Sequence, residues 1–382
     1  MGITFNTAEL RAALSRACLV SERRSTIPIL STVLVSAKNG IAKLTVTDLD
    51  IRFEVEIPVD GDPDGKLAID VRSFARIASV SGETVTITRD ATHFAGRAQL
   101  CLAFSDGEMT VRLNDIFVPE DFPSTMESLP AGGGVEISEG ALHRALSSVG
   151  VCISTEETRY YLNGIFMTGH PETGAMRLVA TDGHRMGIYD FPDMGKLPDA
   201  IIPRKTVKVL LRLIRADGNR CIAMSRHKVD DRSPGYIQFR GDGWMLKSQV
   251  IDGKFPDYTR VLPKGEERRQ ITISREQARR MMLMATVSGE SRACGFDFQK
   301  KLMFVRQNDL GAVEMPSQVE VLDGDRSPKN VGFNVRYLEG ILSATKASAM
   351  VMTGVGDRPE GNAWLFRTED AALTGVLMPM RV

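Results

Sequence analysis

Apolar residues recur at the spacing of an α-helix in six segments of this 382-residue chain. Three segments share one pattern: AELRAALSRACLV (8–20), EGALHRALSSVG (139–150) and REQARRMMLMATV (275–287). The others share a second: DVRSFARIASV (70–80), PRKTVKVLLRLIR (203–215) and NVRYLEGILSAT (334–345). Ser138 and Ser274 precede two of these segments as possible caps, and Pro203 stands in the first turn of another. Each third of the chain holds one segment of each pattern, which indicates an internal repeat of roughly 130 residues.

Between the two helices of each repeat, β-branched and apolar residues alternate with polar ones. This alternation predicts a strand, a turn and a second strand over 28–48, 161–182 and 293–309. The turns fall at Asn39-Gly40, at Gly169 to Gly174 and at Gln299 to Lys301. Strand-like stretches also follow the second helices, as in ETVTITRD (83–90) and AWLFRTEDAALTGVLMPM (363–380). The predicted fold class is α+β, with three tandem copies of a domain whose two helices cover one face of antiparallel sheet.

Proline, glycine and charged residues cluster at 119–134 and 252–269, as is typical of domain boundaries. We therefore expect three domains, over residues 1–130, 131–255 and 256–382. Any α+β chain can offer two helices per repeat by chance. The same order in all three thirds makes that explanation unattractive.

The composition is that of a folded globular protein, with 43% hydrophobic and 25% charged residues. No apolar run approaches the roughly 18 residues of a membrane span, and the N-terminus lacks the pattern of a signal peptide, so we expect a cytoplasmic protein without membrane contact. The cysteines stand singly, without the spacing of a zinc site. We expect them to be reduced and packed, and we expect no metal and no cofactor. They are Cys18, Cys101, Cys152, Cys221 and Cys294.

Positive charge is concentrated in the predicted helices, although the whole chain balances 48 Lys and Arg against 48 Asp and Glu. The windows 9–24, 70–80, 139–150, 203–215, 274–287 and 334–346 hold 17 basic and 6 acidic residues, which leaves 31 and 42 for the remainder. One interpretation is ordinary solvated helix faces. The other is a shared surface that faces a polyanion, without the signatures of base-reading modules and therefore without sequence readout. Its densest points would be Arg23, Arg24, Arg72, Arg204, Lys205, Lys208 and Arg212.

An enzyme is the main rival interpretation, because Asp182 and His184 stand two residues apart and could form an acid–base pair. The sequence has no GxSxG, Walker, GxGxxG or HExxH motif to supply a nucleophile, a phosphate site or a metal. The other histidines, at 93, 143, 170 and 227, have no partner at ligand spacing. We therefore expect a protein without catalytic residues. A different DNA-binding or scaffold protein built on the same repeat is a further alternative.

Several local motifs resemble the signature stretches of the bacterial DNA sliding clamps, the beta subunits of DNA polymerase III. They occur in the order of that family and cover essentially the whole chain: RSTIPIL (24–30), TRYYLNG (158–164), LVATDGHRM (178–186), GKFPDYTRVLP (253–263), GFNVRYLEGIL (332–342) and VLMPMRV (376–382). The resemblance implies a head-to-tail dimeric ring of three-domain chains, with the helices lining the hole and the sheets forming the rim. Met186 and Val382 depart from it, since leucines are usual there.

What the resemblance implies about function is a processivity factor that encircles duplex DNA and slides without sequence specificity. DNA-binding residues on the lining helices would include Arg24, Arg72, Arg204 and Lys205. The implied partners are duplex DNA, a second copy of the chain, the polymerase III alpha subunit, the clamp loader and other proteins that carry a clamp-binding motif.

The resemblance also implies a peptide-binding cleft between the second and third domains, with apolar walls and a few polar groups. Its residues, carried over by motif, are Leu162, Thr181, Gly183, His184, Arg185, Met186, Pro256, Arg260, Val261, Asn334, Tyr337, Val376, Leu377, Met378, Pro379, Met380 and Arg381.

Overall fold

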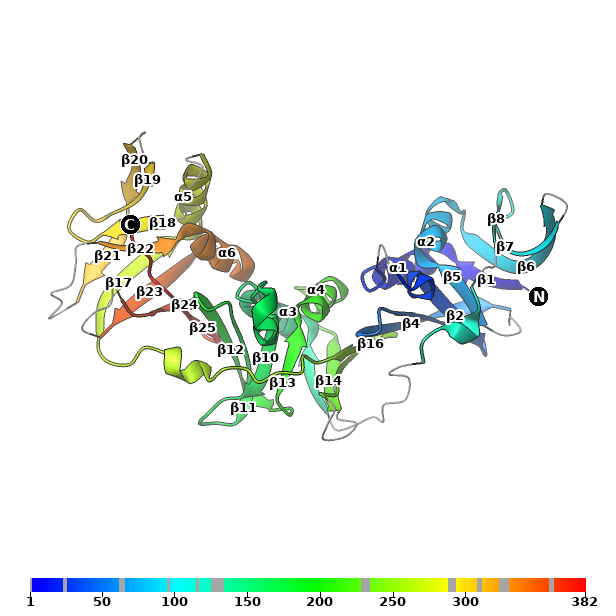
Figure 1. Ribbon diagram of the computed structural model, residues 1–382, viewed down its shortest axis with the longest axis horizontal. Coiled ribbons are helices and arrows are strands. Elements are labelled where there is room, and N and C mark those ends of the chain that lie inside the picture. Colours follow the sequence, from blue (N-terminus) through cyan, green and yellow to red (C-terminus); the bar gives the residue numbers. More distant parts are fainter. Residues whose placement is uncertain are drawn as a thin grey trace. The chain divides into compact units, whose positions relative to one another are not determined.

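The computed structural model describes residues 2–22, 26–61, 66–94, 97–114, 117–124, 134–227, 234–287, 293–307, 311–322, 330–356 and 361–382. The chain folds into two compact units (Figure 1). Unit 1 combines Met1–Glu139 with Lys208–Val250, and unit 2 combines Gly140–Val207 with Ile251–Val382. Both units are built from helices and antiparallel sheet, which confirms the predicted α+β class.

Unit 1 contains a 12-stranded antiparallel sheet with the main path β8-β7-β6-β1-β4-β16-β15-β14-β9. β3 pairs with β4, β2 pairs with β3, and β5 pairs with β2. The strands are β1 (Gly2–Asn6), β2 (Thr32–Lys38), β3 (Ile41–Thr47), β4 (Ile51–Asp60), β5 (Lys66–Asp70), β6 (Thr84–Phe94), β7 (Arg97–Ser105), β8 (Thr110–Asn114), β9 (Gly134–Ser138), β14 (Cys221–His227), β15 (Tyr236–Gly241) and β16 (Trp244–Gln249). Short 3₁₀ helices lie at η1 (Pro28–Ser31) and η2 (Pro119–Asp121).

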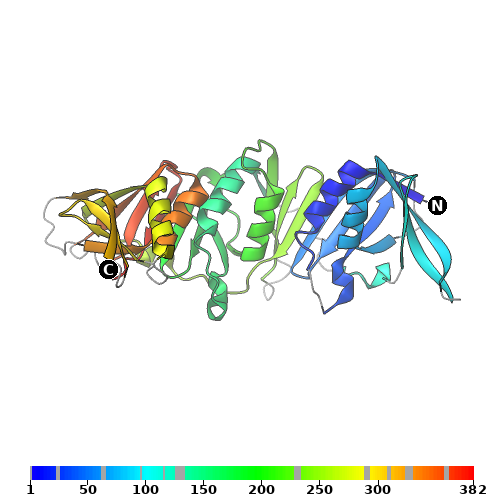
Figure 2. The same cartoon turned by 90° about the horizontal axis from the view of Figure 1, so that it is seen from above.

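Two capped helices, α1 (Thr7–Ala17) and α2 (Val71–Val80), pack against each other in unit 1 (Figure 2). The Asn6 side chain accepts hydrogen bonds from the amides of the first turn of α1, and Asp70 accepts one from Ser73 at the start of α2. These caps satisfy amides that have no partner within the helix. The ring of Phe74 meets that of Phe5 on β1 at 6.0 Å, so α2 packs its apolar face against the sheet.

Unit 2 contains a nine-stranded sheet, β13-β10-β11-β12-β25-β24-β23-β17-β21, and a four-stranded sheet, β20-β19-β18-β22. The strands are β10 (Gly164–Gly169), β11 (Ala175–Thr181), β12 (Arg185–Gly195), β13 (Ala200–Pro203), β17 (Glu267–Ser274), β18 (Ala293–Asp297), β19 (Leu302–Gln307), β20 (Gly311–Pro316), β21 (Gln318–Val321), β22 (Asn330–Asn334), β23 (Ala349–Val355), β24 (Trp364–Thr368) and β25 (Leu373–Leu377). The other helices that the structure describes are α3 (Glu139–Gly150), α4 (Arg204–Leu213), α5 (Arg275–Val287) and α6 (Val335–Thr345), with 3₁₀ helices at η3 (Glu157–Leu162) and η4 (Tyr258–Val261).

All six predicted helices are confirmed, with small differences at their ends. Ser274 caps α5 as predicted: its hydroxyl accepts from the amide of Gln277, whose side chain accepts from the Ser274 amide in return. α1 ends at Ala17 rather than at the predicted residue 20, because the amides of Leu19 and Val20 bond three residues back and tighten the chain into turns.

The predicted hairpins are confirmed as β2–β3, β10–β11 and β18–β19. Asn39 and Gly40 both have positive φ, as the two central residues of a tight hairpin turn require. A further pairing joins β12 to β25, with Met186 opposite Val376 and Arg185 opposite Leu377. That pairing makes one sheet from strands far apart in the sequence, and the candidate site lies beside it.

Candidate functional site

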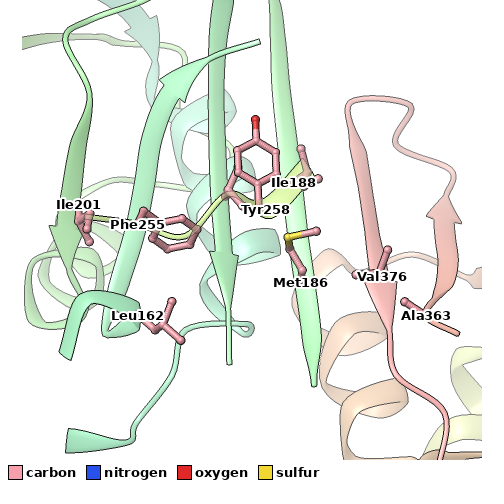
Figure 3. Packing of buried hydrophobic residues seen from close by; sticks show 9 residues of the cluster. Leu162, Met186, Ile188, Ile201, Phe255, Tyr258, Ala363 and Val376 are labelled. Carbon is pink, nitrogen blue, oxygen red and sulfur yellow. The ribbon is translucent and has the colours of Figure 1, made fainter. Parts of the chain in front are cut away.

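A pocket of about 160 Å³ opens in unit 2, where the β11–β12 hairpin, η4 and the end of β25 meet. Most of its wall is apolar. It is lined by Leu162, Thr181, Gly183, His184, Arg185, Met186, Pro256, Asp257, Tyr258, Val261, Val376 and Met378. Behind it lies a cluster of buried side chains, in which Tyr258 stands beside Met186 and Ile188 (Figure 3).

The hairpin turn between β11 and β12 forms one side of the pocket. One carboxylate oxygen of Asp182 accepts from the amides of His184 and Arg185, at 2.9 and 3.0 Å. The other oxygen accepts from Nε of Arg185 at 3.0 Å. Gly183 takes a φ of 89°, which favours glycine, so the sequence TDGHR folds into a rigid polar turn.

The side chains of Arg185 and His184 in that turn contact an aromatic ring. The guanidinium carbon of Arg185 lies 4.3 Å from the centre of the Tyr337 ring on α6, and the His184 ring lies 6.5 Å from the same ring. Both carboxylate oxygens of Asp182 therefore accept hydrogen bonds within the turn, from backbone amides and from the Arg185 side chain. This arrangement gives no support to an acid–base pair of Asp182 and His184.

The connector from Ile251 to Val261 forms a second part of the pocket wall. Its first residue donates a backbone hydrogen bond to the carbonyl of Ile201, at 2.9 Å. Phe255 then stacks on Phe166 of β10, with ring centres 4.8 Å apart and planes 10° from parallel. Asp257 caps η4 by accepting from the amide of Thr259. Stacking and capping together bring Pro256, Tyr258 and Val261 to the pocket.

The C-terminal tail closes the third side. After β25, the amide of Met378 donates to the carbonyl of His184 at 2.8 Å. Two residues later, the amide of Met380 donates to the carbonyl of Gly332 on β22, also at 2.8 Å. A Cβ on Gly332 would lie 2.7 Å from the carbonyl oxygen of Met380, so only glycine admits the tail backbone this closely. Backbone bonds thus hold the tail between the hairpin turn and the edge of the four-stranded sheet.

Ten residues predicted for the cleft line this pocket: Leu162, Thr181, Gly183, His184, Arg185, Met186, Pro256, Val261, Val376 and Met378. Seven others do not line it. Tyr337 lies behind Arg185, Asn334 caps α6, and Leu377 is fully buried in β25. Arg260 points to solvent and pairs with Asp257 at 3.0 Å. Pro379, Met380 and Arg381 continue the tail past the pocket.

Sequence reasoning missed Asp257 and Tyr258 as pocket residues. Both stand inside the motif GKFPDYTRVLP, from which only Pro256, Arg260 and Val261 were carried over. The signal that could have indicated Tyr258 is its residue type, since a tyrosine can bury its ring and still keep its hydroxyl hydrogen-bonded.

The predicted DNA-binding residues lie on helices, except that Arg24, like its neighbour Arg23, falls outside the described residues. Arg72 is half-buried on α2. Arg204 begins α4 and donates to the carbonyl of Ser154 at 3.4 Å, while Lys205 is exposed. Within α4 the exposed cations are Lys205, Lys208 and Arg212. Their spacing places them on one face, opposite buried Val207 and Leu210.

The described cysteines are free, as predicted, but they are not all packed. Cys152 and Cys294 are fully buried, and burial raises the pKa of each thiol to about 12. Cys221 on β14 is exposed, which corrects the expectation for that residue. It occupies an outward position at the start of its strand, where the alternating pattern buries the next residue, Ile222. The side chain of Cys101 lies outside the described part of the chain.

Over the described ranges, no helix is long and apolar enough to cross a membrane. The same residues hold no group of three or more His, Cys, Asp or Glu side chains placed to bind a metal ion.

Comparison with known structures shows the fold to be that of the DNA sliding clamps. The crystal structure of the DNA polymerase sliding clamp from Caulobacter crescentus superposes with a TM-score of 0.84 at 29% identity, over 100% of both chains. The sliding clamp from Bartonella birtlesii, solved bound to griselimycin, gives a TM-score of 0.83 at 30% identity, again over 100% of each chain.

Sequence comparisons agree with the structural ones. Residues 1–95 match the N-terminal domain of the DNA polymerase III beta subunit, and residues 136–257 match its central domain. The beta sliding clamp of Caulobacter vibrioides is 31% identical over 100% of both chains. The chain belongs to the DNA polymerase III beta subunit family, the bacterial sliding clamps.

Proposed function

We propose that this chain is a processivity clamp that closes as a head-to-tail dimeric ring around duplex DNA, slides without reading sequence, and tethers polymerase III. Membership of the clamp family supports the ring. The exposed cations of α4, all on one face, support phosphate contacts of the weak, exchangeable kind that sliding requires. No catalytic residue is part of the proposal.

The observation that carries the tethering role is the pocket beside the β12–β25 pairing. An apolar hollow of about 160 Å³, rimmed by backbone groups and by Arg185, suits an extended peptide that inserts apolar side chains. Met186 and Met378 give the walls flexible, polarizable side chains, which suit a site that accepts several partners. The proposed partners are the polymerase alpha subunit, the clamp loader and other proteins with the same motif.

We assign the domains as residues 1–130, 131–255 and 256–382. The matches to N-terminal and central domain models support the first two assignments. On this division, the pocket draws on the second and third domains.

The test measures peptide binding and topological DNA binding on the same preparation. A fluorescent polymerase-derived peptide with a glutamine and two downstream hydrophobic residues should bind, by anisotropy. The loaded protein should be retained on circular duplex DNA and lost once the circle is cut, because a ring slides off an end. Equal retention on circular and linear DNA would contradict the ring, and absence of peptide binding would contradict the tether.

A further inference from the structure

We propose that Arg177, which does not line the pocket, is a positioning residue for it: Arg177 holds Tyr258, and with it the connector wall, at the place where a peptide binds. This inference rests on the proposed tethering function. It concerns a side chain on β11 that acts through η4.

Arg177 is fixed first by its neighbour across the sheet. It stands directly opposite Asp190 on β12. Its Nε and Nη2 donate to the two oxygens of Asp190, at 2.5 and 2.8 Å. The arginine side chain is only 9% exposed. Such a two-pronged pair sets the plane of the guanidinium group, because both hydrogen bonds must lie in it.

The remaining nitrogen is then aimed at the connector. Nη1 of Arg177 donates to the hydroxyl oxygen of Tyr258 at 3.4 Å, and the guanidinium carbon lies 6.0 Å from the centre of the tyrosine ring. Tyr258 is 7% exposed and lines the pocket. Asp190, Arg177 and Tyr258 therefore form a chain of contacts that runs from the sheet to the pocket wall.

This contact fixes a part of the connector that the other anchors do not reach. The Phe255–Phe166 stack holds the segment before the pocket, and the Asp257 cap acts only within η4 itself. Tyr258 is the first residue of η4, and its side chain joins that turn to β11 and β12. Without its partner the hydroxyl would be buried and unpaired, so the ring would tend to turn out of the wall.

The charge that this arrangement needs is secure. Burial alone would lower the pKa of Arg177, but hydrogen bonds to Asp190 and Tyr258 outweigh it and raise the pKa above its usual value. Arginine stays protonated across the physiological pH range, so the guanidinium group keeps its charge for both contacts.

The test measures affinity for the polymerase-derived peptide in a set of full-length variants. Arg177→Met should weaken peptide binding roughly tenfold, because Tyr258 would no longer be held in the pocket wall. Arg177→Lys should recover part of the affinity, because an ammonium group can still reach one of its partners. Arg177→Met leaves the carboxylate of Asp190 without its ion-pair partner, which destabilises the fold. The double variant Arg177→Met/Asp190→Leu avoids this cost, because it replaces both partners by apolar groups.

A cycle with Tyr258→Phe separates positioning from general destabilisation. If Arg177 acts through the tyrosine hydroxyl, Arg177→Met should cost much less affinity in the Tyr258→Phe background than in the wild type. A loss by the same factor in both backgrounds would overturn the proposal. So would a folded Arg177→Met/Asp190→Leu chain that binds as tightly as the wild type.

The matched control is Arg52→Met in unit 1. Arg52 is likewise buried and bonds Glu54 at 2.7 Å, and its Nη1 donates to the carbonyl of Pro123 at 3.0 Å. Its loss should leave peptide affinity unchanged. An equal loss in this control would assign the effect to stability and overturn the positioning role. A wild-type chain that fails to bind the peptide would instead remove the tethering function itself.

Discussion

The guanidinium group of Arg185 lies over the ring of Tyr337, 4.3 Å from its centre. Arg185 begins β12 and also pairs with Asp182, while Tyr337 stands in the first turn of α6. The contact therefore ties the polar turn at the pocket to a helix that starts more than one hundred residues later. The arginine is 15% exposed, so water screens the contact only partly.

The first prediction concerns this contact. Tyr337→Leu should lower the free energy of unfolding by about 1 kcal/mol, because the arginine loses the face of an aromatic ring in a half-buried place. Tyr337→Phe keeps the ring and should lose less. Urea denaturation of both variants, followed by circular dichroism, measures the difference. Equal losses in the two variants would show that the ring face contributes nothing.

The second prediction concerns the tail. Deleting residues 378–382 removes Met378 from the pocket wall and both backbone bonds of the tail. Losing an apolar anchor contact typically costs about 2 kcal/mol, roughly thirtyfold in affinity. Met378→Ala should reproduce most of the loss, and Met380→Ala, whose side chain does not line the pocket, should reproduce little. Anisotropy with the polymerase-derived peptide measures both. Unchanged affinity in the shortened chain would remove the tail from the site.

The third prediction concerns DNA. Arg72→Ala or Lys205→Ala should weaken residence on DNA to the same extent for every sequence, and should lower the salt slope by about one unit for each lost phosphate contact. Peptide affinity should stay constant. The control is Arg367→Ala, an exposed strand arginine that pairs with Glu267. A change in preference among DNA sequences would contradict the proposal that these helices line the hole and contact only the phosphate backbone.

The fourth prediction concerns the thiols. Cys221 should react first with iodoacetamide at pH 8, and half-buried Cys18 should react more slowly, because burial raises its pKa. Cys152 and Cys294 should react only after unfolding, since burial raises both pKa values to about 12 and leaves almost no thiolate. Peptide mapping by mass spectrometry identifies the labelled sites. Rapid labelling of Cys152 in the folded protein would contradict the packing around it.

The fifth prediction concerns assembly. Native mass spectrometry should give about twice the chain mass of 42.0 kDa. On the proposed division into three similar domains, each chain has two unlike ends, and two chains would close head to tail as a pair. Tail deletion and Arg177→Met should leave the protein dimeric. A monomer at micromolar concentration would contradict the ring.

Local sequence signals predicted the elements of this fold well. The Asn39-Gly40 turn was predictable because both positions need positive φ, which these residue types tolerate. α4 was predictable because Val209 and Leu213 recur one turn apart between exposed cations. The spacing of apolar residues indicates which face of a helix or strand is buried, and α4 buries one face.

The site could be predicted only in part. Ten pocket residues came from motifs, but no local pattern tells β12 to pair with β25, because pairing depends on which distant strand completes the sheet. The same limit applies to the placement of Tyr258 in η4, because its partner Arg177 lies on β11, 81 residues away in the sequence. It also misplaced Cys221, since composition predicts average burial and not the outward position at the start of β14.

The pairing of β12 with β25 also has a consequence during synthesis. β25 leaves the ribosome long after β12, so β12 has an open edge, with apolar Met186 and Ile188 exposed beside it, until β25 has been translated. A nascent chain in this state offers a template for pairing with another chain, which is a route to aggregation. A message cut short before codon 373 would leave that edge open permanently, so products without β25 should depend on chaperones or proteolysis far more than chains that contain it.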